Sequence, residues 1–329
     1  MPSRRRAFVV LALLALLSIL ALLTALMVGS LVVAPTEVLA ALAGGGDGVG
    51  AEVIRNLRLP RALGAFACGG LLALAGALMQ VLLRNPLADP YVLGISGGAG
   101  VGALTAMLFG LPLLVIHGGA FGGALIAMLL VFGLAHGDSS WTQARLLLTG
   151  VIVAAGCGAA VALILTLAPE QKLHGMLFWL MGDASQIVSP WPALVVLTAG
   201  LAISLPFARE MNLLARGETL AGSLGVAVPR LRRVLYVLAS LLTATAVTSA
   251  GSIGFVGLVV PHLMRLALGN DQRLLLPAAA LAGGILLTLA DTLARTVAAP
   301  QQLPVGVLTA LIGVPLFLFL LGRQPGGRA

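Results

Sequence analysis

The sequence predicts an all-α, polytopic membrane protein of about ten transmembrane helices, organised as a single domain over residues 1–329. Three observations predict this class. Hydrophobic residues make up 60% of the chain and charged residues only 9%, whereas a soluble domain carries about 25% charged residues. Apolar runs of about 20 residues, the length that crosses a bilayer, recur along the whole chain. The Lys and Arg residues are distributed unequally between the segments that connect these runs.

The apolar runs divide into five predicted spans in each half of the chain. The first half contains Phe8–Val28, Ala62–Leu83, Leu93–Ile116, Gly118–Ala135 and Leu146–Ala168. The second half contains Trp191–Ala208, Val234–Ala250, Ile253–Leu268, Leu275–Val297 and Val305–Leu321. The first run is longer than the roughly 7–15 residues of a secretion-signal core, so we interpret it as an uncleaved span. The eighth run is short and contains Pro261, which predicts a broken or partial crossing that protein shields from lipid.

The basic residues predict the orientation of the spans. If the N-terminus lies in the cytoplasm and the spans alternate, 14 of the 19 Lys and Arg residues fall on the cytoplasmic side. The other five are Arg55, Arg58, Arg61, Lys172 and Arg295. Because cytoplasmic segments of membrane proteins are enriched in Lys and Arg, this bias predicts a multi-pass inner (cytoplasmic) membrane protein with cytoplasmic N- and C-termini.

Glycines four residues apart predict close packing of helix backbones, as small residues do in membrane proteins. Such pairs are Gly118 with Gly122 and Gly119 with Gly123. The glycine-rich run Gly94–Gly102 superficially resembles a phosphate loop, but a Walker A loop needs a Gly-Lys pair and the chain contains none. We therefore interpret this run as helix packing, or as a kinked helix beside a cavity, and predict no ATP site of the P-loop type.

Several kinds of chemistry are not supported by the sequence. The net charge of +8 comes from arginines scattered singly between apolar runs, so no nucleic-acid-binding face is predicted. We find no catalytic residues, no metal site and no cofactor motif. The clear intramembrane acid is Asp291, and Arg295 lies one helical turn away, which predicts a structural ion pair. A proton relay in an ion-coupled secondary transporter is the alternative for Asp291, and a non-transporting membrane scaffold is a third hypothesis.

Six blocks of sequence resemble the FecCD-type permeases, which carry iron-siderophores, haem and cobalamin across bacterial inner membranes. In chain order they are RLPR (Arg58–Arg61), LRNPLADPYVLGISGGAGVG (Leu83–Gly102), WLMGD (Trp179–Asp183), LLARGETLAGSLGV (Leu213–Val226), GSIGFVGLVVPHLMR (Gly251–Arg265) and LADTLARTVAAPQQLPVGVLTALIGVP (Leu289–Pro315). The resemblance covers almost the whole chain. It implies a type II ABC importer permease fold, working as a homodimer in the lipid bilayer.

The same resemblance implies the partners and the cargo. Two copies of a separate ABC ATPase subunit would bind beneath the permease, and a periplasmic substrate-binding protein would dock on the opposite side. The chain itself would then be a transport subunit and not an enzyme, with no cofactor of its own. An iron(III)-siderophore is the expected cargo, with haem or cobalamin as alternatives.

The resemblance also implies roles for particular residues. Arg58, Arg61 and Arg295 match family arginines that meet glutamates of the binding protein, and anchoring a helix end at the headgroups is the alternative for Arg58 and Arg61. A cytoplasmic coupling loop of about residues 209–233 matches the segment that contacts the ATPase, with an ordinary solvated loop as the alternative. Its matching residues, expected in short helical segments closed by Gly217 and Gly225, are Arg216, Gly217, Glu218, Thr219, Ser223, Leu224 and Gly225.

A gate is implied at the start of the fifth span. The cobalamin permease has small hydroxyl residues at this place, whereas this chain has Gln143 and Ala144, preceded by Thr142. The departure changes the expected details of the gate and argues against a direct assignment to cobalamin.

Overall fold

The computed structural model describes residues 4–29, 33–45, 48–135 and 143–323. In this part of the chain the regular structure is helical, without strands. The α-helices are α1 (Arg4–Met27), α2 (Pro35–Leu42), α3 (Val49–Val53), α4 (Leu59–Leu82), α5 (Ile95–Leu108), α6 (Leu113–Ala135), α7 (Gln143–Leu167), α8 (Glu170–Met181), α9 (Trp191–Ser204), α10 (Ala208–Leu214), α11 (Glu218–Ser223), α12 (Val228–Ala250), α13 (Val256–Leu268), α14 (Gln272–Thr296) and α15 (Val305–Arg323). A π-helical turn, Ile54–Arg58, joins α3 to α4.

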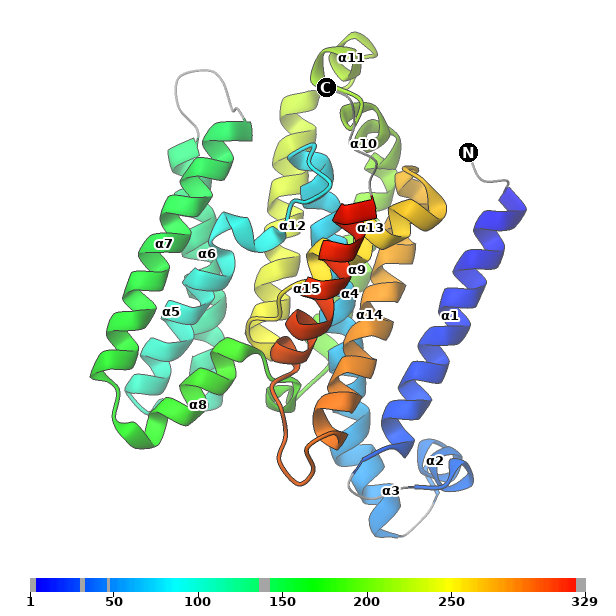
Figure 1. Ribbon diagram of the computed structural model, residues 1–329, viewed down its shortest axis with the longest axis vertical. Helices are drawn as coiled ribbons and strands as arrows, with labels where there is room; N and C mark the ends of the chain where they lie inside the picture. Colours follow the sequence, from blue (N-terminus) through cyan, green and yellow to red (C-terminus); the bar gives the residue numbers. More distant parts are fainter. Residues whose placement is uncertain (1–3, 30–32, 46–47, 136–142, 324–329) are drawn as a thin grey trace.

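The apolar helices run between two ends of the molecule (Figure 1). The short helices α2, α3 and α8 lie at one end, which we call the α8 end, and α10 and α11 lie at the other, the α11 end. Within the described residues, seven helical segments have the length and composition to cross a membrane, and three shorter apolar helices, α5, α13 and α15, accompany them. The predicted all-helical membrane fold is therefore confirmed, and each predicted span corresponds to one of these apolar helices.

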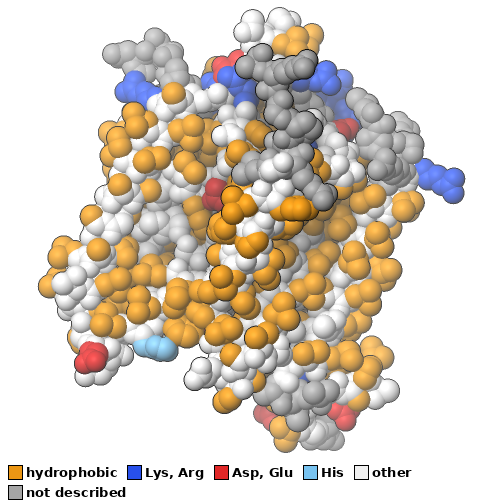
Figure 2. All heavy atoms as spheres, viewed as in Figure 1, with side chains coloured by type: hydrophobic (Ala, Val, Ile, Leu, Met, Phe, Trp, Pro, Cys, Tyr) orange, Lys and Arg blue, Asp and Glu red, His pale blue; other side chains and the backbone are white. Residues whose placement is uncertain are grey.

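Charged side chains are concentrated at the ends of the molecule, and its sides are apolar (Figure 2). Lys and Arg side chains gather at the α11 end, whereas the visible face of the α8 end shows mainly acidic ones. Helix α1 begins and helix α15 ends at the α11 end (Figure 1). The unequal distribution of basic residues that the sequence predicted thus corresponds to the two ends of one bundle.

Helix α4 lies at the centre of the bundle. Every residue from 67 to 83 is buried, and α4 packs against α9, α12, α13 and α14. A helix that is buried all round must be apolar all round, and small residues let its neighbours approach closely. A Cβ atom placed on Gly69 of α4 would lie only 2.1 Å from the carbonyl oxygen of Gly283 on α14. Glycine is required where these two backbones touch.

The predicted glycine packing is confirmed for one of the two pairs on α6. Gly119 and Gly123 face α5, and a Cβ on Gly123 would lie 2.1 Å from the carbonyl oxygen of Gly98. Gly118 and Gly122 face open space, with no heavy atom within 4 Å of such a Cβ, so the prediction is wrong for them. The two pairs point to different sides of the helix, and periodicity alone does not show which side has a neighbour.

One predicted span boundary is wrong. The third predicted span, Leu93–Ile116, contains the end of α5 at Leu108 and the start of α6 at Leu113, separated by a turn at Gly110 with φ of 68°. The residues of this turn are as apolar as the helices, so hydropathy does not detect it. The eighth predicted span, expected to be broken or partial, corresponds to α13, which is continuous through Pro261 but only 13 residues long. Helix α13 is short because it begins inside the bundle.

Candidate functional site

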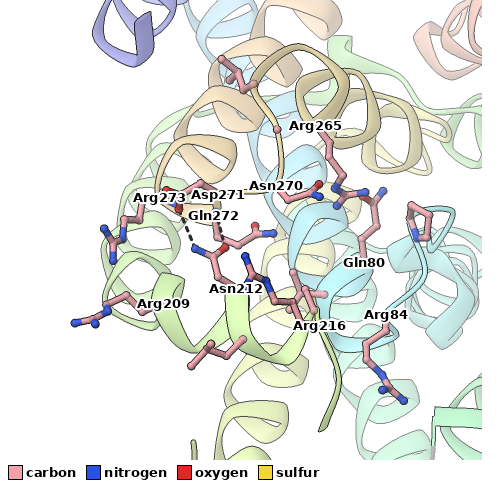
Figure 3. Close-up of a pocket in the computed structure, with 16 residues that line it drawn as sticks. Gln80, Arg84, Arg209, Asn212, Arg216, Arg265, Asn270, Asp271, Gln272 and Arg273 are labelled. Atoms are coloured by element: carbon pink, nitrogen blue, oxygen red, sulfur yellow. Dashed lines mark hydrogen bonds between the residues drawn. The ribbon is translucent and has the colours of Figure 1, made fainter. Parts of the chain in front are cut away.

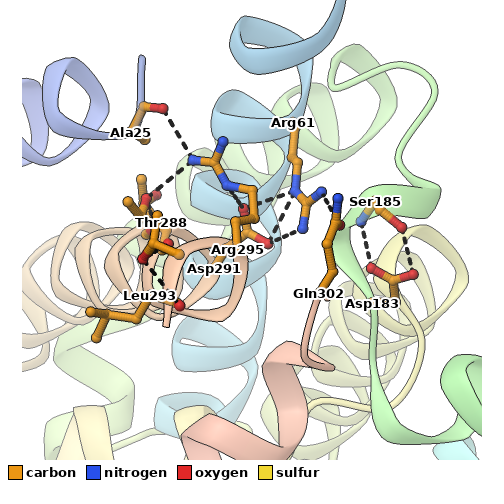
Figure 4. A network of polar contacts seen from close by, with 11 residues as sticks. Ala25, Arg61, Asp183, Ser185, Thr288, Asp291, Leu293, Arg295 and Gln302 are labelled. Atoms are coloured by element: carbon orange, nitrogen blue, oxygen red, sulfur yellow. Dashed lines mark hydrogen bonds and ion pairs between the residues drawn. The ribbon is translucent and has the colours of Figure 1, made fainter. Parts of the chain in front are cut away.

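Asp291 and Arg61 form a buried ion pair at the α8 end. The guanidinium of Arg61, at the start of α4, contacts both carboxylate oxygens of Asp291 near the end of α14, with its Nη2 2.8 Å from Oδ1 and its Nε 3.0 Å from Oδ2 (Figure 4). The predicted partner, Arg295, is also present, with its Nε 3.5 Å from Oδ2. The side chain of Asp291 is only 2% exposed. Two guanidinium groups thus contact a carboxylate that is almost completely buried.

Two of the predicted docking arginines, Arg58 and Arg295, bind the last carbonyl groups of α1. Arg58 Nη1 donates to the carbonyl oxygens of Leu26 and Met27, at 2.7 and 3.2 Å. Arg295 Nη2 donates to the carbonyl oxygen of Ala25 at 3.0 Å (Figure 4). The final carbonyls of a helix lack intrahelical donors, and cations near that end are also favoured by the helix dipole. The arginines therefore cap α1 and hold it to α4 and α14.

These contacts bear on the docking prediction, which remains a prediction. Arg58 is buried, and the side chains of Arg61 and Arg295 are 13% and 11% exposed. Arg61 reaches the surface, where its Nη1 donates to Oε1 of the exposed Gln302 at 2.9 Å. Of the three arginines, Arg58 is the least available to a partner protein in this conformation.

At the α11 end, the predicted coupling loop is largely helical. Helix α10 ends at Leu214 and α11 occupies Glu218–Ser223, with Gly217 and Gly225 at positive φ of 133° and 83° where the chain turns. The expected short helices closed by these glycines are therefore present. The last residues of the predicted loop belong to α12, which begins at Val228. Leu224, which follows α11, is 58% exposed.

Glu218 connects α11 to two other elements of the α11 end. It forms an ion pair with Arg232 of α12, and Arg84 Nη2 lies 3.4 Å from its Oε1. Arg84 follows α4 at φ of 45°, a backbone conformation that non-glycine residues rarely adopt. The same Nη2 of Arg84 donates to Oε1 of Gln143 at 3.1 Å, and Gln143 Nε2 donates to the carbonyl oxygen of Leu82. Sequence reasoning did not assign a role to Arg84.

The predicted gate residues lie where α7 begins. Gln143 is the first residue of α7 and is half-buried, and Ala144 is exposed. Thr142 lies outside the described residues. Arg84 thus contacts both a predicted gate residue, Gln143, and a predicted coupling residue, Glu218.

Two short helices, α5 and α13, begin next to each other in the interior. The hydroxyl of Tyr91 donates to the carbonyl oxygen of Ile253 at 3.0 Å and accepts from its N–H at 2.9 Å. The residues before the two helices, Gly94 and Phe255, both have left-handed backbones, with φ of 71° and 69°. Irregular backbone leaves buried polar groups that the protein must satisfy, and Tyr91 does this for Ile253. Sequence reasoning found these segments as blocks but not their contact, because they lie far apart in the chain.

Asp89 lies in the connecting segment between α4 and α5. Its Oδ1 accepts from the N–H of Tyr91 at 2.7 Å and caps the short 3₁₀ turn Pro90–Leu93. Burial raises the pKa of Asp89 to about 6, and the hydrogen bond from Tyr91 opposes that rise. Asp89 can therefore change its charge in the mildly acidic range.

Comparisons with known proteins agree with this architecture. The model of the FecCD transport family matches residues 15–323. The hemin transport system permease protein HmuU of Yersinia pestis is 45% identical over 278 residues, covering 82% of this chain and 83% of that protein. The cobalamin import system permease protein BtuC of Halobacterium salinarum is 42% identical, covering 82% and 73%. A solved metal-chelate type ABC transporter in an inward-facing conformation superimposes with a TM-score of 0.83 at 32% identity, covering 97% of this chain and all of that one.

Proposed function

Because the chain belongs to the FecCD transport family, we propose that it is the membrane-spanning permease subunit of an ATP-binding-cassette importer for a metal chelate. ATP would be hydrolysed by a separate partner subunit, present in two copies, since no Gly-Lys pair for a P-loop occurs in the sequence. The permease would form a homodimer. Helix α7 supports this, because its apolar residues such as Leu148 and Ile152 are 63% and 62% exposed, available to a second copy or to lipid.

The contact of Arg84 with both Glu218 and Gln143 carries this proposal. Glu218 opens α11, the short polar helix that we assign to ATPase contact, and Gln143 opens α7, whose start we assign to the gate. Arg84 Nη2 lies 3.4 Å from Oε1 of Glu218 and 3.1 Å from Oε1 of Gln143. A displacement of α11 by the ATPase would therefore be transmitted to the start of α7. Arg216, Gly217, Thr219, Ser223, Leu224 and Gly225 complete the proposed coupling segment.

We place the α11 end on the cytoplasmic side of the bacterial inner membrane, with both termini on that side. The support is the concentration of Lys and Arg side chains at that end, in line with the positive-inside rule (Figure 2). The α8 end would then face the periplasm and receive the binding protein. Arg61 and Arg295 are the proposed docking residues, and Arg58 contributes by holding α1 in place.

Among cargoes we propose an iron(III)-siderophore first, with haem or cobalamin as alternatives. The relatives support a chelate or tetrapyrrole in general, since their names specify hemin in one case and cobalamin in another. The binding protein performs most of the selection in the proposed system, so the permease contributes little to the choice.

The test is reconstitution of the chain in proteoliposomes with a candidate ABC ATPase subunit and a candidate binding protein. Uptake of an iron-siderophore that requires ATP and both partners would support the proposal, and haem and cobalamin are assayed in parallel. Uptake that needs an ion gradient and no partner would contradict it. In that case Asp291→Asn should abolish transport, because Asp291 is the acid that a secondary transporter would titrate.

A further inference from the structure

A basic cavity opens at the α11 end. It has a volume of about 640 Å³ and is lined by residues at the ends of α4, α13 and α14 and by α10 (Figure 3). Five of the lining residues are arginines, namely Arg84, Arg209, Arg216, Arg265 and Arg273. Figure 3 shows Arg216 and Arg265 near the centre, whereas the side chains of Arg209 and Arg273 extend outward on one side and that of Arg84 on the other.

The positive charge of this cavity is not neutralised by the residues that line it. Among the described residues, the one carboxylate that lines the cavity is that of Asp271, and its Oδ1 accepts from Asn212 Nδ2 at 2.9 Å and from the N–H of Arg273 at 3.2 Å. Asp271 is thus committed to capping the start of α14. Glu218 pairs with Arg84, but no described carboxylate lies within 4 Å of the guanidinium groups of the other four arginines.

The wall of the cavity also contains a buried amide with an unused polar atom. Gln272 is 2% exposed, and its side-chain oxygen has no hydrogen-bond partner among the described residues. Rotating this amide by half a turn would exchange that oxygen for an NH₂ group. An anion in the cavity would then receive donors from both guanidinium and amide groups.

We propose that this cavity binds a phosphate anion, of the kind carried by the headgroup of an anionic phospholipid or by a free phosphate compound. Guanidinium groups match phosphate oxygens in a two-pronged geometry, and several of them together suit a group with several oxygens. The volume is within the roughly 300–1,000 Å³ of small-molecule sites and is larger than one carboxylate requires. Basic pockets between helices at the cytoplasmic side are also suited to anionic headgroups. The inference depends on the orientation proposed above but not on import.

The position of the site suggests its consequence. The cavity is bounded by α10 on one side and by α4 and α14 on the other. A bound phosphate would join these elements and hold α10, which precedes the coupling helix α11. Its absence would leave the arginines repelling one another across the cavity.

The site is tested with the full-length chain in nanodiscs of phosphatidylcholine with or without phosphatidylglycerol. We expect phosphatidylglycerol to bind and to raise the melting temperature of the wild type. The double variant R216Q/R265Q should bind it about tenfold more weakly, a factor typical of losing a charge-assisted hydrogen bond. The matched control is R230Q/R233Q, which removes two exposed arginines of α12 at the same end that do not line the cavity.

Further arms identify the source of the phosphate. Inorganic phosphate and pyrophosphate are titrated in phosphatidylcholine nanodiscs, and binding of these without a response to phosphatidylglycerol would assign the site to a free phosphate compound. Equal lipid binding by the cavity variant and its control, with no phosphate response, would overturn the proposal. So would an occupant that appears only when the ATPase is added, because the cavity would then receive a carboxylate of that partner. R216K/R265K, which keeps the charge, separates lost binding from misfolding.

Discussion

Arg61 and Asp291 are 230 residues apart in the chain, yet the Nη2 atom of Arg61 lies 2.8 Å from Oδ1 of Asp291. The contact joins the start of α4, the central helix, to the last turns of α14. Arg295, the partner predicted from its spacing of four residues, lies farther away at 3.5 Å. The carboxylate thus fixes two helices that meet at the α8 end, and it does so beside the carbonyls that end α1.

Removing this carboxylate should destabilise the protein. Replacing Asp291 by Asn leaves Arg61 and Arg295 without their anion in a site where they are mostly buried, and such losses cost about 3–5 kcal/mol. We expect a clear fall in the melting temperature of the purified chain in detergent. The double variant Arg61→Gln with Asp291→Asn should recover part of the lost melting temperature, because the uncompensated charge of Arg61 is then gone. A single variant as stable as wild type would show that the ion pair is dispensable.

The contact of Glu218 with Arg84 should matter for coupling, and its loss in Arg84→Gln should hardly change stability. Both side chains are 36% exposed, and exposed pairs contribute about 0–1 kcal/mol. In the reconstituted transporter, Glu218→Gln and Arg84→Gln should lower the amount of cargo imported per ATP hydrolysed, whereas Glu210→Gln on α10 serves as the control. Leu224→Ala should act in the same direction, because Leu224 belongs to the proposed ATPase contact. Unchanged coupling in all three variants would place the connection elsewhere.

Charge reversal at the α8 end should weaken docking of the binding protein. Arg61→Glu and Arg295→Glu remove the proposed partners of its carboxylates, so we expect about a tenfold lower affinity in nanodiscs, typical of a lost charge-assisted contact. Each reversal also places a carboxylate beside Asp291 and should lower stability, so assembly with the ATPase is measured first and only variants that still assemble are compared. Glu52→Gln, an exposed change at the same end, is the control. An unaltered affinity would refute the assignment of both arginines.

Two neighbouring glycines on α6 offer a matched packing test. A Cβ on Gly123 would lie 2.1 Å from the carbonyl oxygen of Gly98, whereas a Cβ on Gly122 has no heavy atom within 4 Å. Gly123→Ala should therefore force α5 and α6 apart and cost about 1–3 kcal/mol, as overpacking does. Gly122→Ala should be neutral or slightly stabilising because alanine favours the helix. Thermal unfolding of the two variants side by side provides the comparison.

Asp89 predicts a pH dependence of stability. Burial raises its pKa from an ordinary value near 4 to about 6, so the folded protein retains a proton that the unfolded chain releases between these values. Stability should therefore fall as the pH rises through this window. Asp89→Asn keeps the oxygen that accepts from Tyr91 and removes the titration, so its melting temperature should lose less between pH 4 and pH 7 than that of the wild type. Parallel profiles for the two proteins would contradict this role.

Hydropathy identified the apolar helices because a membrane protein must satisfy its backbone within each span and cover it with apolar side chains. It failed at the turn around Gly110, where apolar residues continue through a change of direction. For the site, the blocks of sequence located Glu218 and Arg61 but not their partners. Arg84 received no role, because nothing in the local sequence shows that its guanidinium reaches both α11 and α7.

The sequence by itself determined the class of protein, the number of apolar helices and the end at which most basic residues lie, because composition and period are local properties. Only the tertiary structure decided which polar side chains meet. Arg61 with Asp291, Tyr91 with Ile253, and the arginines that surround the cavity at the α11 end are contacts between distant segments. Such contacts depend on which faces of the packed helices lie against one another. Close backbone contacts at glycines such as Gly69 and Gly283 determine those faces.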